Sequence, residues 1–377
     1  MKFRKKGIRA IVSVNIQFPY LYAKQVLPLP ARHLRPFLLL FLCCTVACRH
    51  RDKTLGFYYW KTVFTLDSVE KAALAENAVH TLYIRFFDVD WAPGDTAPLP
   101  VAPVRLDTLP AGISIVPVVY IRNRVFQQMT PAGVPVFAAR VAGLVREMAT
   151  ATRAGDTTGR RLVTSSAPET QFDCDWTEGT KARYFAFLEA YRRLTGQTLS
   201  ATIRLHQVKY PDRSGIPPVD YGVLMFYNMG AIDAGNQRSI YEKATAIRYI
   251  PALPAYPLTL DVALPFFAWG IQIRDQKAIR LLDKMDAGDF DRDTGFLRTA
   301  PGRYVARYPG FRNGFYFREG DEVKIEAVSR EDLLDMVRSV NRYTNHRIRN
   351  LIFYDLDASN LLRYDKNVFQ EVLAHTD

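Results

Sequence analysis

Eight strand-like segments alternate with helix-like segments along the chain, and this order constrains the fold more than any other feature. The strand-like segments are rich in β-branched and aromatic residues and occupy residues 57–64, 81–91, 113–121, 170–176, 199–208, 221–230, 258–270 and 350–357. Most intervening segments place apolar residues at helical spacing, as in Tyr184, Phe187, Leu188 and Tyr191. Eight such units in about 300 residues predict an α/β fold, the (β/α)8 or TIM barrel.

An open, doubly wound sheet is the competing architecture for the same alternation. It is disfavoured because no glycine-rich phosphate loop follows the first strand-like segment. Residues 271–328 interrupt the alternation with an acidic stretch and two short strand-like runs. We therefore expect a barrel over residues 57–377, with residues 271–328 inserted between the seventh strand and its helix.

The positive charge of the chain is concentrated at its N-terminus. Residues 1–51 contain ten Lys and Arg and no Asp or Glu, so subtracting that +10 from the formal net charge of +12 leaves +2 for residues 52–377. A nearly neutral body lacks the basic surface that binds phosphate backbones. No nucleic-acid partner is expected.

The basic N-terminus has the pattern of an export signal. Arg32 and Arg35 precede the apolar run PFLLLFLCCTVA, which is short for a bilayer span but suits a signal-peptide core. The stretch TVAC, ending at Cys48, looks like a bacterial lipobox. We expect residues 1–48 to be a signal-peptide and lipobox region and residues 49–56 a tether. Cys48 would then anchor an exported lipoprotein to a membrane of the bacterial cell envelope, the outer membrane in a Gram-negative cell. An ordinary secretory signal or a single membrane anchor is the alternative.

Three Asp-x-Asp pairs close strand-like segments: Asp88 and Asp90, Asp173 and Asp175, and Asp355 and Asp357. Side chains alternate along a strand, so the two aspartates of a pair share one face, and a barrel gathers its strand ends at the active-site mouth. Buried carboxylates are costly without partners, and the expected inward partners are Arg85, Arg122 and Arg204. The alternative is that some pairs only cap helices or bind arginines.

Four segments carry a resemblance to a known family. The stretches TQFDCDWTE, LMFYNMG, LDVALPFFAWG and LIFYDLD resemble the fourth, sixth, seventh and eighth strands of family-eighteen glycoside hydrolases, the chitinases, and occur in the same order. The chain also resembles uncharacterised bacterial lipoproteins predicted to share that barrel. The expected insertion falls where many chitinases carry a small α+β domain. As short motifs, the resemblance covers most of residues 57–377, and it implies a barrel with a carbohydrate-facing cleft.

The fourth strand of the chitinases ends in DxxDxDxE, and the chain matches this motif in part. Asp173 and Asp175 stand at its last two aspartates, which the resemblance implies orient the substrate. Its first aspartate falls on Thr170, and its proton-donating glutamate falls on Thr177. A threonine cannot act as the general acid of that reaction, and Glu178 is one position late. The resemblance therefore does not extend to the proton donor of chitinase-type catalysis.

Other positions match the family or suit a saccharide site. Tyr227 stands at the tyrosine of the sixth strand, and Asn228 replaces the aspartate that follows it. Trp269 and Tyr354 lie where aromatic rings would stack on sugar rings. Core packing is the alternative role for each aromatic residue.

The sequence thus predicts a chitinase-like envelope lipoprotein that binds a glycan in an acidic, aromatic cleft. The catalytic positions are Asp173, Asp175 and Tyr227, and the ligand-binding positions are Asp88, Asp90, Arg204, Asn228, Trp269, Tyr354, Asp355 and Asp357. Whether the site also hydrolyses the glycan is open, because the proton donor would have to come from another strand. A structural envelope lipoprotein with no saccharide site is the alternative. The chain has no HExxH, paired-cysteine zinc spacing or GxSxG, so neither a metal nor a cofactor is expected.

Overall fold

The computed structural model describes residues 53–106, 112–154, 169–344 and 348–376, and these form one compact unit that begins at Asp52. The predicted signal peptide, the lipidation site at Cys48 and residues 49–52 of the predicted tether lie outside the described residues. Among the helices of the described part, none is long and apolar enough to cross a bilayer.

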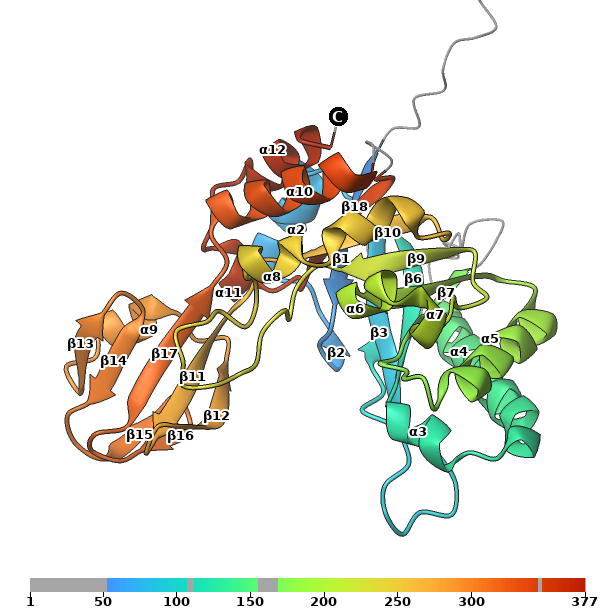
Figure 1. Cartoon of the computed structure of the whole chain (residues 1–377), viewed down its shortest axis with the longest axis horizontal. Helices are drawn as coiled ribbons and strands as arrows, with labels where there is room; N and C mark the ends of the chain where they lie inside the picture. Colours follow the sequence, from blue (N-terminus) through green and yellow to red (C-terminus); the bar gives the residue numbers. More distant parts are fainter. Residues whose placement is uncertain (1–52, 107–111, 155–168, 345–347, 377) are drawn as a thin grey trace, which may run out of the picture. The chain divides into compact units, whose positions relative to one another are not determined.

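Eight parallel strands close into a barrel (Figure 1). They are β1 (Thr54–Tyr59), β3 (Thr81–Asp90), β6 (Ser114–Ile121), β7 (Glu169–Asp173), β8 (Thr198–Arg204), β9 (Tyr221–Met225), β10 (Leu260–Pro265) and β18 (Asn350–Tyr354). Closure comes from β1, which pairs with β18 on one side and with β3 on the other. The predicted (β/α)8 barrel is confirmed, and the open doubly wound sheet is excluded because its edge strands would remain unpaired.

Helices and short strands connect the barrel strands. The helices are α2 (Ser68–Glu76), α3 (Asn123–Gln128), α4 (Val134–Ala154), α5 (Lys181–Thr195), α6 (Leu205–Lys209), α7 (Pro211–Ser214), α8 (Lys243–Ile247), α10 (Arg330–Thr344), α11 (Ala358–Leu361) and α12 (Val368–Ala374). Two 3-10 helices, η1 (Pro131–Gly133) and η2 (Ile250–Ala255), and three short strands, β2 (Val63–Phe64), β4 (Leu99–Val101) and β5 (Arg105–Leu106), complete the connections.

Local signals in the sequence set several helix positions. The predicted apolar spacing in α5 is confirmed, because Tyr184, Phe187, Leu188 and Tyr191 are all buried. Helix α10 starts with a capping box. Ser329 N donates to Asp332 Oδ2 at 2.9 Å, and Asp332 N donates to Ser329 Oγ at 3.0 Å.

A second, five-stranded antiparallel sheet, called here the small sheet, lies between β10 and α10 in the chain. Its order is β12-β11-β17-β14-β13. Its elements, with an adjoining helix and hairpin, are β11 (Ala268–Arg274), β12 (Lys277–Asp283), α9 (Ala287–Asp291), β13 (Phe296–Ala300), β14 (Arg303–Ala306), β15 (Gly310–Arg312), β16 (Phe315–Phe317) and β17 (Glu322–Ala327). It has a separate hydrophobic core built on residues such as Phe290, Tyr304 and Val323.

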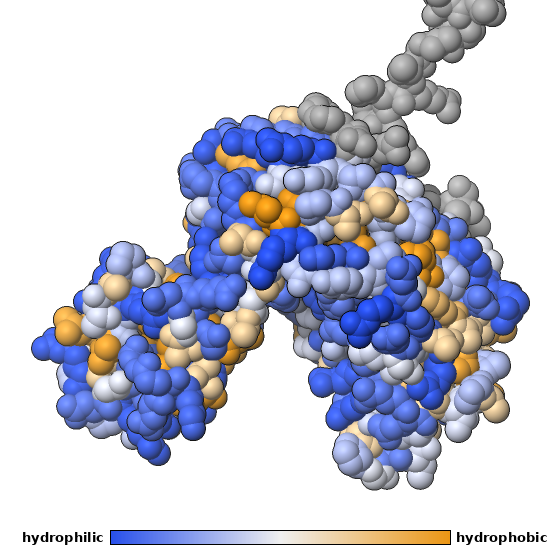
Figure 2. All heavy atoms as spheres, viewed as in Figure 1, coloured by the Kyte–Doolittle hydropathy of each residue, from blue (hydrophilic) through white to orange (hydrophobic). Residues whose placement is uncertain are grey.

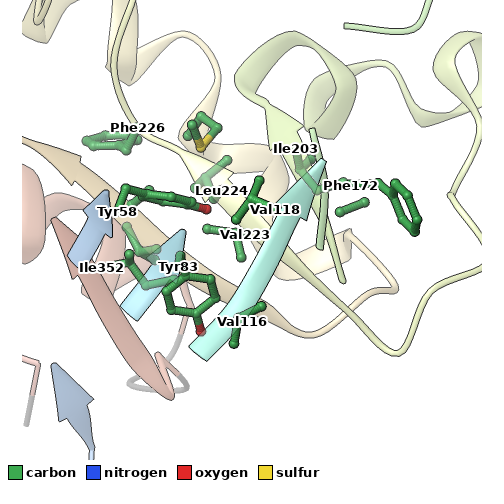
Figure 3. Packing of buried hydrophobic residues seen from close by; sticks show 14 of the residues in the cluster. Tyr58, Tyr83, Val116, Val118, Phe172, Ile203, Val223, Leu224, Phe226 and Ile352 are labelled. Carbon is green, nitrogen blue, oxygen red and sulfur yellow. The ribbon is translucent and has the colours of Figure 1, made fainter. Parts of the chain in front are cut away.

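The main core fills the barrel and the space under its helices. Inside the barrel, Tyr58 and Tyr83 lie beside Val118 and Val223, contributed by four different strands (Figure 3). On the face seen in Figure 2, hydrophobic residues form separate groups among hydrophilic ones. The main core holds the strand ends in fixed positions, which a site at those ends requires.

The predicted strands over residues 170–176, 221–230 and 350–357 end earlier, at Asp173, Met225 and Tyr354. Two further differences from the sequence prediction lie near the site. The predicted strand over residues 199–208 ends at Arg204, because the backbone turns into α6 and Arg204 N donates to the Gln207 side chain at 2.8 Å. The predicted strand over residues 258–270 is two strands, β10 and β11, in different sheets. Apolar sequence continues across the second break, over residues 264–269, so composition alone could not reveal it.

Candidate functional site

Four polar side chains meet where β7 and β8 end. Asp173 is the last residue of β7, and Asp175 follows two positions later. From β8, the Thr202 hydroxyl donates to Asp173 Oδ1 at 2.6 Å, and Arg204 Nε donates to Asp175 Oδ1 at 2.6 Å. The parallel pairing of β7 with β8 places the two strand ends side by side. We call these four residues the acidic group.

The two carboxylates of the acidic group have different environments. Asp173 is 5% exposed, whereas the side chain of Asp175 is 52% exposed. Burial raises the pKa of the Asp173 carboxyl, the Arg204 guanidinium opposes that rise, and the charge of Asp175 adds to it. Asp173 is therefore biased towards holding a proton, while Asp175 offers an ion-paired carboxylate to solvent.

A connected set of aromatic rings lies at the ends of β1, β9 and β18. Tyr354 is at its centre, with its ring centroid 5.8 Å from Tyr58, 5.5 Å from Trp60, 5.6 Å from Tyr227 and 5.8 Å from Phe267. Tyr227 and Tyr354 are stacked with an interplanar angle of 28°. Trp60 and Tyr354 are half-buried. We call this set the aromatic group.

Tyr227 connects the acidic group with the aromatic group. It is 4% exposed, and its hydroxyl donates to Met225 Sδ at 3.4 Å. Burial raises its pKa well above the usual value, Arg204 opposes the rise, and the charges of Asp173 and Asp355 add to it. Tyr227 therefore stays a neutral phenol close to acids from both β7 and β18.

Asp355 follows Tyr354 at the end of β18. Asn360 Nδ2 donates to its Oδ1 at 2.8 Å. Burial raises the pKa of Asp355 to about 6, although the charge of Lys284 opposes the rise. A carboxyl with this pKa is partly protonated near neutral pH, as a general acid must be.

Asp357 has a structural environment instead. It accepts from Ser359 N at 3.0 Å at the start of α11, and Lys61 and Lys284 lie 3.0 and 2.7 Å from its Oδ2. Burial raises its pKa, but the hydrogen bonds from Lys284, Ser359 and Lys61 lower the pKa by more than burial raises it, so the net shift is downward. This aspartate both caps a helix and binds lysines, which is the alternative role considered from the sequence.

The remaining pair divides in the same way. Asp90 binds Arg124 through both carboxylate oxygens, and Arg122 Nε lies 3.3 Å from its Oδ2. The hydrogen bonds from Arg124 hold the pKa of Asp90 below its usual range. Asp88 is 8% exposed and lies 3.4 Å from Arg85, and burial raises its pKa. Asp88 also raises the pKa of Asp173, so it lies near the acidic group, whereas Asp90 is neutralised by two arginines.

Two predicted ligand-binding residues lie at the edges of these groups. Trp269 is half-buried in β11 and packs on Phe267 with ring centroids 5.1 Å apart, which links it to the aromatic group. Asn228 is exposed directly after Tyr227, with a φ of 55°. Asparagine tolerates this left-handed backbone better than most residues.

The residues at the other motif positions do not supply an acid. Thr170 is fully buried and faces α5, where its Oγ1 lies 3.1 Å from the Tyr191 hydroxyl. Thr177 pairs with Thr180 at the start of α5. Glu178 is exposed and lies 3.2 Å from Arg213 Nε. The Glu178 carboxylate therefore pairs with Arg213 and not with a residue of the acidic group.

The structure adds residues that sequence reasoning missed. Thr202 could have been found, since it precedes Arg204 by two positions on the same strand face. Trp60 lies past the end of β1, and the Arg85 guanidinium lies over its ring, 5.8 Å from the ring centroid. Lys284 could not have been found, because it comes from the loop after β12 in the small sheet. Among the described residues, no group of three or more His, Cys, Asp or Glu could hold a metal ion.

Comparisons with known proteins give weak structural similarities. No family model matches the chain, and no curated protein matches its sequence. The Bacillus cereus spore cortex-lytic enzyme SleL is similar at a TM-score of 0.46 and 12% identity over 86% of this chain and 74% of that one. The chitinase ChiB of Flavobacterium johnsoniae is similar at a TM-score of 0.46 and 11% identity, over 86% of this chain and 94% of that one. The tamarind chitinase-like lectin is similar at a TM-score of 0.39 and 9% identity, over 85% of this chain and 98% of that one. These TM-scores are too low to support an argument about the fold. The fold is established by the closed barrel of the chain itself.

Proposed function

We propose that this protein binds a glycan at the carboxyl ends of its barrel strands. The observation that carries the proposal is the meeting of two groups there: the hydrogen-bonding acidic group of Asp173, Asp175, Thr202 and Arg204, and the stacked rings of Tyr227 and Tyr354. Sugars offer hydroxyls to carboxylate and guanidinium groups and apolar CH faces to aromatic rings. The solvent-exposed Asp175 and the half-buried Arg204, Trp60 and Tyr354 are the side chains that a saccharide would reach.

The proposal includes the location inferred from the N-terminal sequence. The basic stretch, the apolar run and the TVAC stretch support an exported lipoprotein attached through Cys48 to the cell envelope. Envelope glycans and chitin-type oligosaccharides are then the first ligands to consider.

Hydrolysis of that glycan is a second candidate function, and Asp355 is the residue that favours it. With a pKa raised to about 6, Asp355 can donate its proton to the departing glycosidic oxygen. Asp175 would then take a proton from the water that attacks the anomeric carbon, so that one bond breaks and one forms with protons balanced. This reaction replaces the acid that Thr177 cannot provide.

Binding is tested on the compact unit of residues 52–377 with a panel of envelope and chitin-type oligosaccharides, by titration calorimetry. We expect one or more saccharides to bind and Asp175→Asn to weaken that binding at least tenfold. The matched control is Asp220→Asn, because Asp220 also forms a half-exposed ion pair with an arginine, Arg192 at 3.0 Å. Absence of binding by the unaltered protein would favour the structural lipoprotein.

Hydrolysis is tested in the same samples by chromatography of released products. If Asp355 is the proton donor, Asp355→Asn will still bind the saccharide but release no product. Product release that persists in Asp355→Asn would exclude this donor, and binding without any product in the unaltered protein would identify a lectin-like function.

A further inference from the structure

The chain between β9 and α8, residues 228–242, directly follows Tyr227 and is held by the small sheet. Figure 1 draws this segment in yellow-green. Three side chains of β14 and β17 bind it, those of Arg303, Lys324 and Glu326, and its own Arg238 donates from Nη2 to the Ala327 carbonyl of β17 at 2.7 Å. Glu326 and Lys324 are 3% and 5% exposed, although residues of these types are seldom buried. Their burial needs an explanation.

Glu326 binds one end of the segment. Its Oε2 accepts hydrogen bonds from Ser239 N at 2.7 Å, from the Ser239 hydroxyl at 2.5 Å and from Ile240 N at 3.3 Å. A carboxylate that accepts several donors from one short stretch of backbone fixes the position of that stretch. Ser239 is therefore attached to β17 by both its backbone and its side chain.

Lys324 and Arg303 bind the middle of the segment. Lys324 Nζ donates to the carbonyls of Gly235 and Gln237, both at 2.9 Å. Arg303 Nη2 donates to the carbonyl of Ala234 at 3.0 Å and to that of Gly235 at 2.9 Å. These carbonyls have no strand or helix to pair with, so the two cations satisfy acceptors that the segment leaves open. Lys324 also lies 2.8 Å from Glu326 Oε1, which neutralises the buried carboxylate.

The anchored end of the segment is tied back to the barrel strand. The Ser239 carbonyl accepts hydrogen bonds from Met229 N at 2.9 Å and from Gly230 N at 3.1 Å. A Cβ at Gly230 would lie 2.7 Å from the Arg238 carbonyl, so glycine permits this close approach. The connection thus runs from Glu326 through Ser239 to Met229, two positions after Tyr227.

We propose that Glu326 and Lys324 are positioning residues for the glycan site. They hold residues 228–242 on the small sheet, and through Ser239 they fix the chain that carries Tyr227 and Asn228. The small sheet is then a brace for the β9 side of the site. The proposal rests on the proposed glycan binding for its effect on affinity, but its effect on the segment itself is independent of any ligand.

The experiment is hydrogen-deuterium exchange of the full-length protein, resolved at residues 228–242, together with saccharide titration. In Glu326→Gln, we expect the amides of Met229, Gly230, Ser239 and Ile240 to exchange at least tenfold faster and saccharide affinity to fall about fivefold. Ser239→Ala removes only the hydroxyl contact, and we expect a smaller change in the same direction. This second variant decides the question if Glu326→Gln fails to fold.

The matched control is Asp321→Asn. Asp321 is 2% exposed, directly precedes β17 and binds Arg274 of β11 through both oxygens, but its side chain makes no described contact with residues 228–242. It should loosen the small sheet without changing saccharide affinity. Unchanged exchange at the four amides in the folded variants would overturn the proposal. Faster exchange with unchanged affinity would overturn the positioning role, and absence of saccharide binding in the unaltered protein would instead refute the proposed function.

Discussion

Arg204 Nε lies 2.6 Å from Asp175 Oδ1, and the same guanidinium opposes the rise in the pKa of the buried Asp173. One partly buried cation therefore compensates two carboxylates that lie two positions apart at the end of β7. Arg204 therefore balances the charge of the site, and its replacement should change how stability depends on pH.

Replacement of Arg204 by glutamine should destabilise the protein more at neutral than at acidic pH. Without the guanidinium, the ionised Asp173 is buried without compensation, at a cost on the order of 2–4 kcal/mol. The folded-state pKa of Asp173 would rise further, so its ionisation costs stability as the pH increases. Urea unfolding at pH 5 and pH 7.5 measures this difference. Arg192→Gln, which breaks the half-exposed pair with Asp220, should cost less than about 1 kcal/mol at both pH values.

Replacement of Asp355 by asparagine should stabilise the protein above pH 6. The pKa of Asp355 is raised from 3.8 to about 6, so the folded state binds the proton more tightly than the unfolded state. Stability from this group is present below about pH 4 and is lost as the pH rises to about 6. The ionised carboxyl then costs on the order of 2–3 kcal/mol, and asparagine keeps an acceptor for Asn360. Unfolding midpoints from pH 4 to 8 test this, and a variant that is equally destabilised at every pH would contradict it.

Replacement of Asp357 by asparagine should have the opposite pH dependence. The pKa of Asp357 is lowered in the folded protein, so its contribution to stability is present above the unfolded pKa of about 4 and is lost as the pH falls. Because Lys284 is partly exposed, we expect a loss of about 1–2 kcal/mol at pH 7. Asparagine is an equally good helix cap, so the ion pairs are tested separately from the cap. The free energy of unfolding at pH 3 and pH 7 provides the measurement, and an equal loss at both would exclude an electrostatic origin.

Replacement of Tyr58 by phenylalanine should weaken the inside of the barrel. The Tyr58 hydroxyl donates to Gln171 Oε1 at 2.6 Å, and both side chains are fully buried. The variant leaves the Gln171 oxygen without its donor, which costs about 1–3 kcal/mol. Thermal unfolding measures the loss. Tyr308→Phe, at a residue that is 48% exposed, should leave the melting temperature unchanged, and an equal shift in both variants would refute the role of the buried bond.

The eight-strand alternation predicted parallel strands that are buried on both faces. The missing glycine-rich phosphate loop then favoured the barrel over an open sheet. The sequence also placed Asp173, Asp175 and Arg204 together, since period-two alternation and parallel order bring neighbouring strand ends to one mouth. The three expected arginine partners, Arg85, Arg122 and Arg204, each form an ion pair with one of the predicted aspartates. These inferences needed only local periodicity and strand order.

The different environments of three similar Asp-x-Asp pairs were decided by the tertiary structure. Asp90 is neutralised by Arg124 from α3, and Asp357 by Lys61 and Lys284 from two distant loops, while Asp173 and Asp355 are buried with raised pKa values. The sequence alone determined which chemical groups reach the barrel mouth. Which of them hold a proton, bind a cation or remain open to solvent depends on burial and on partners far away in the chain, because desolvation and Coulomb energies are set by three-dimensional distance.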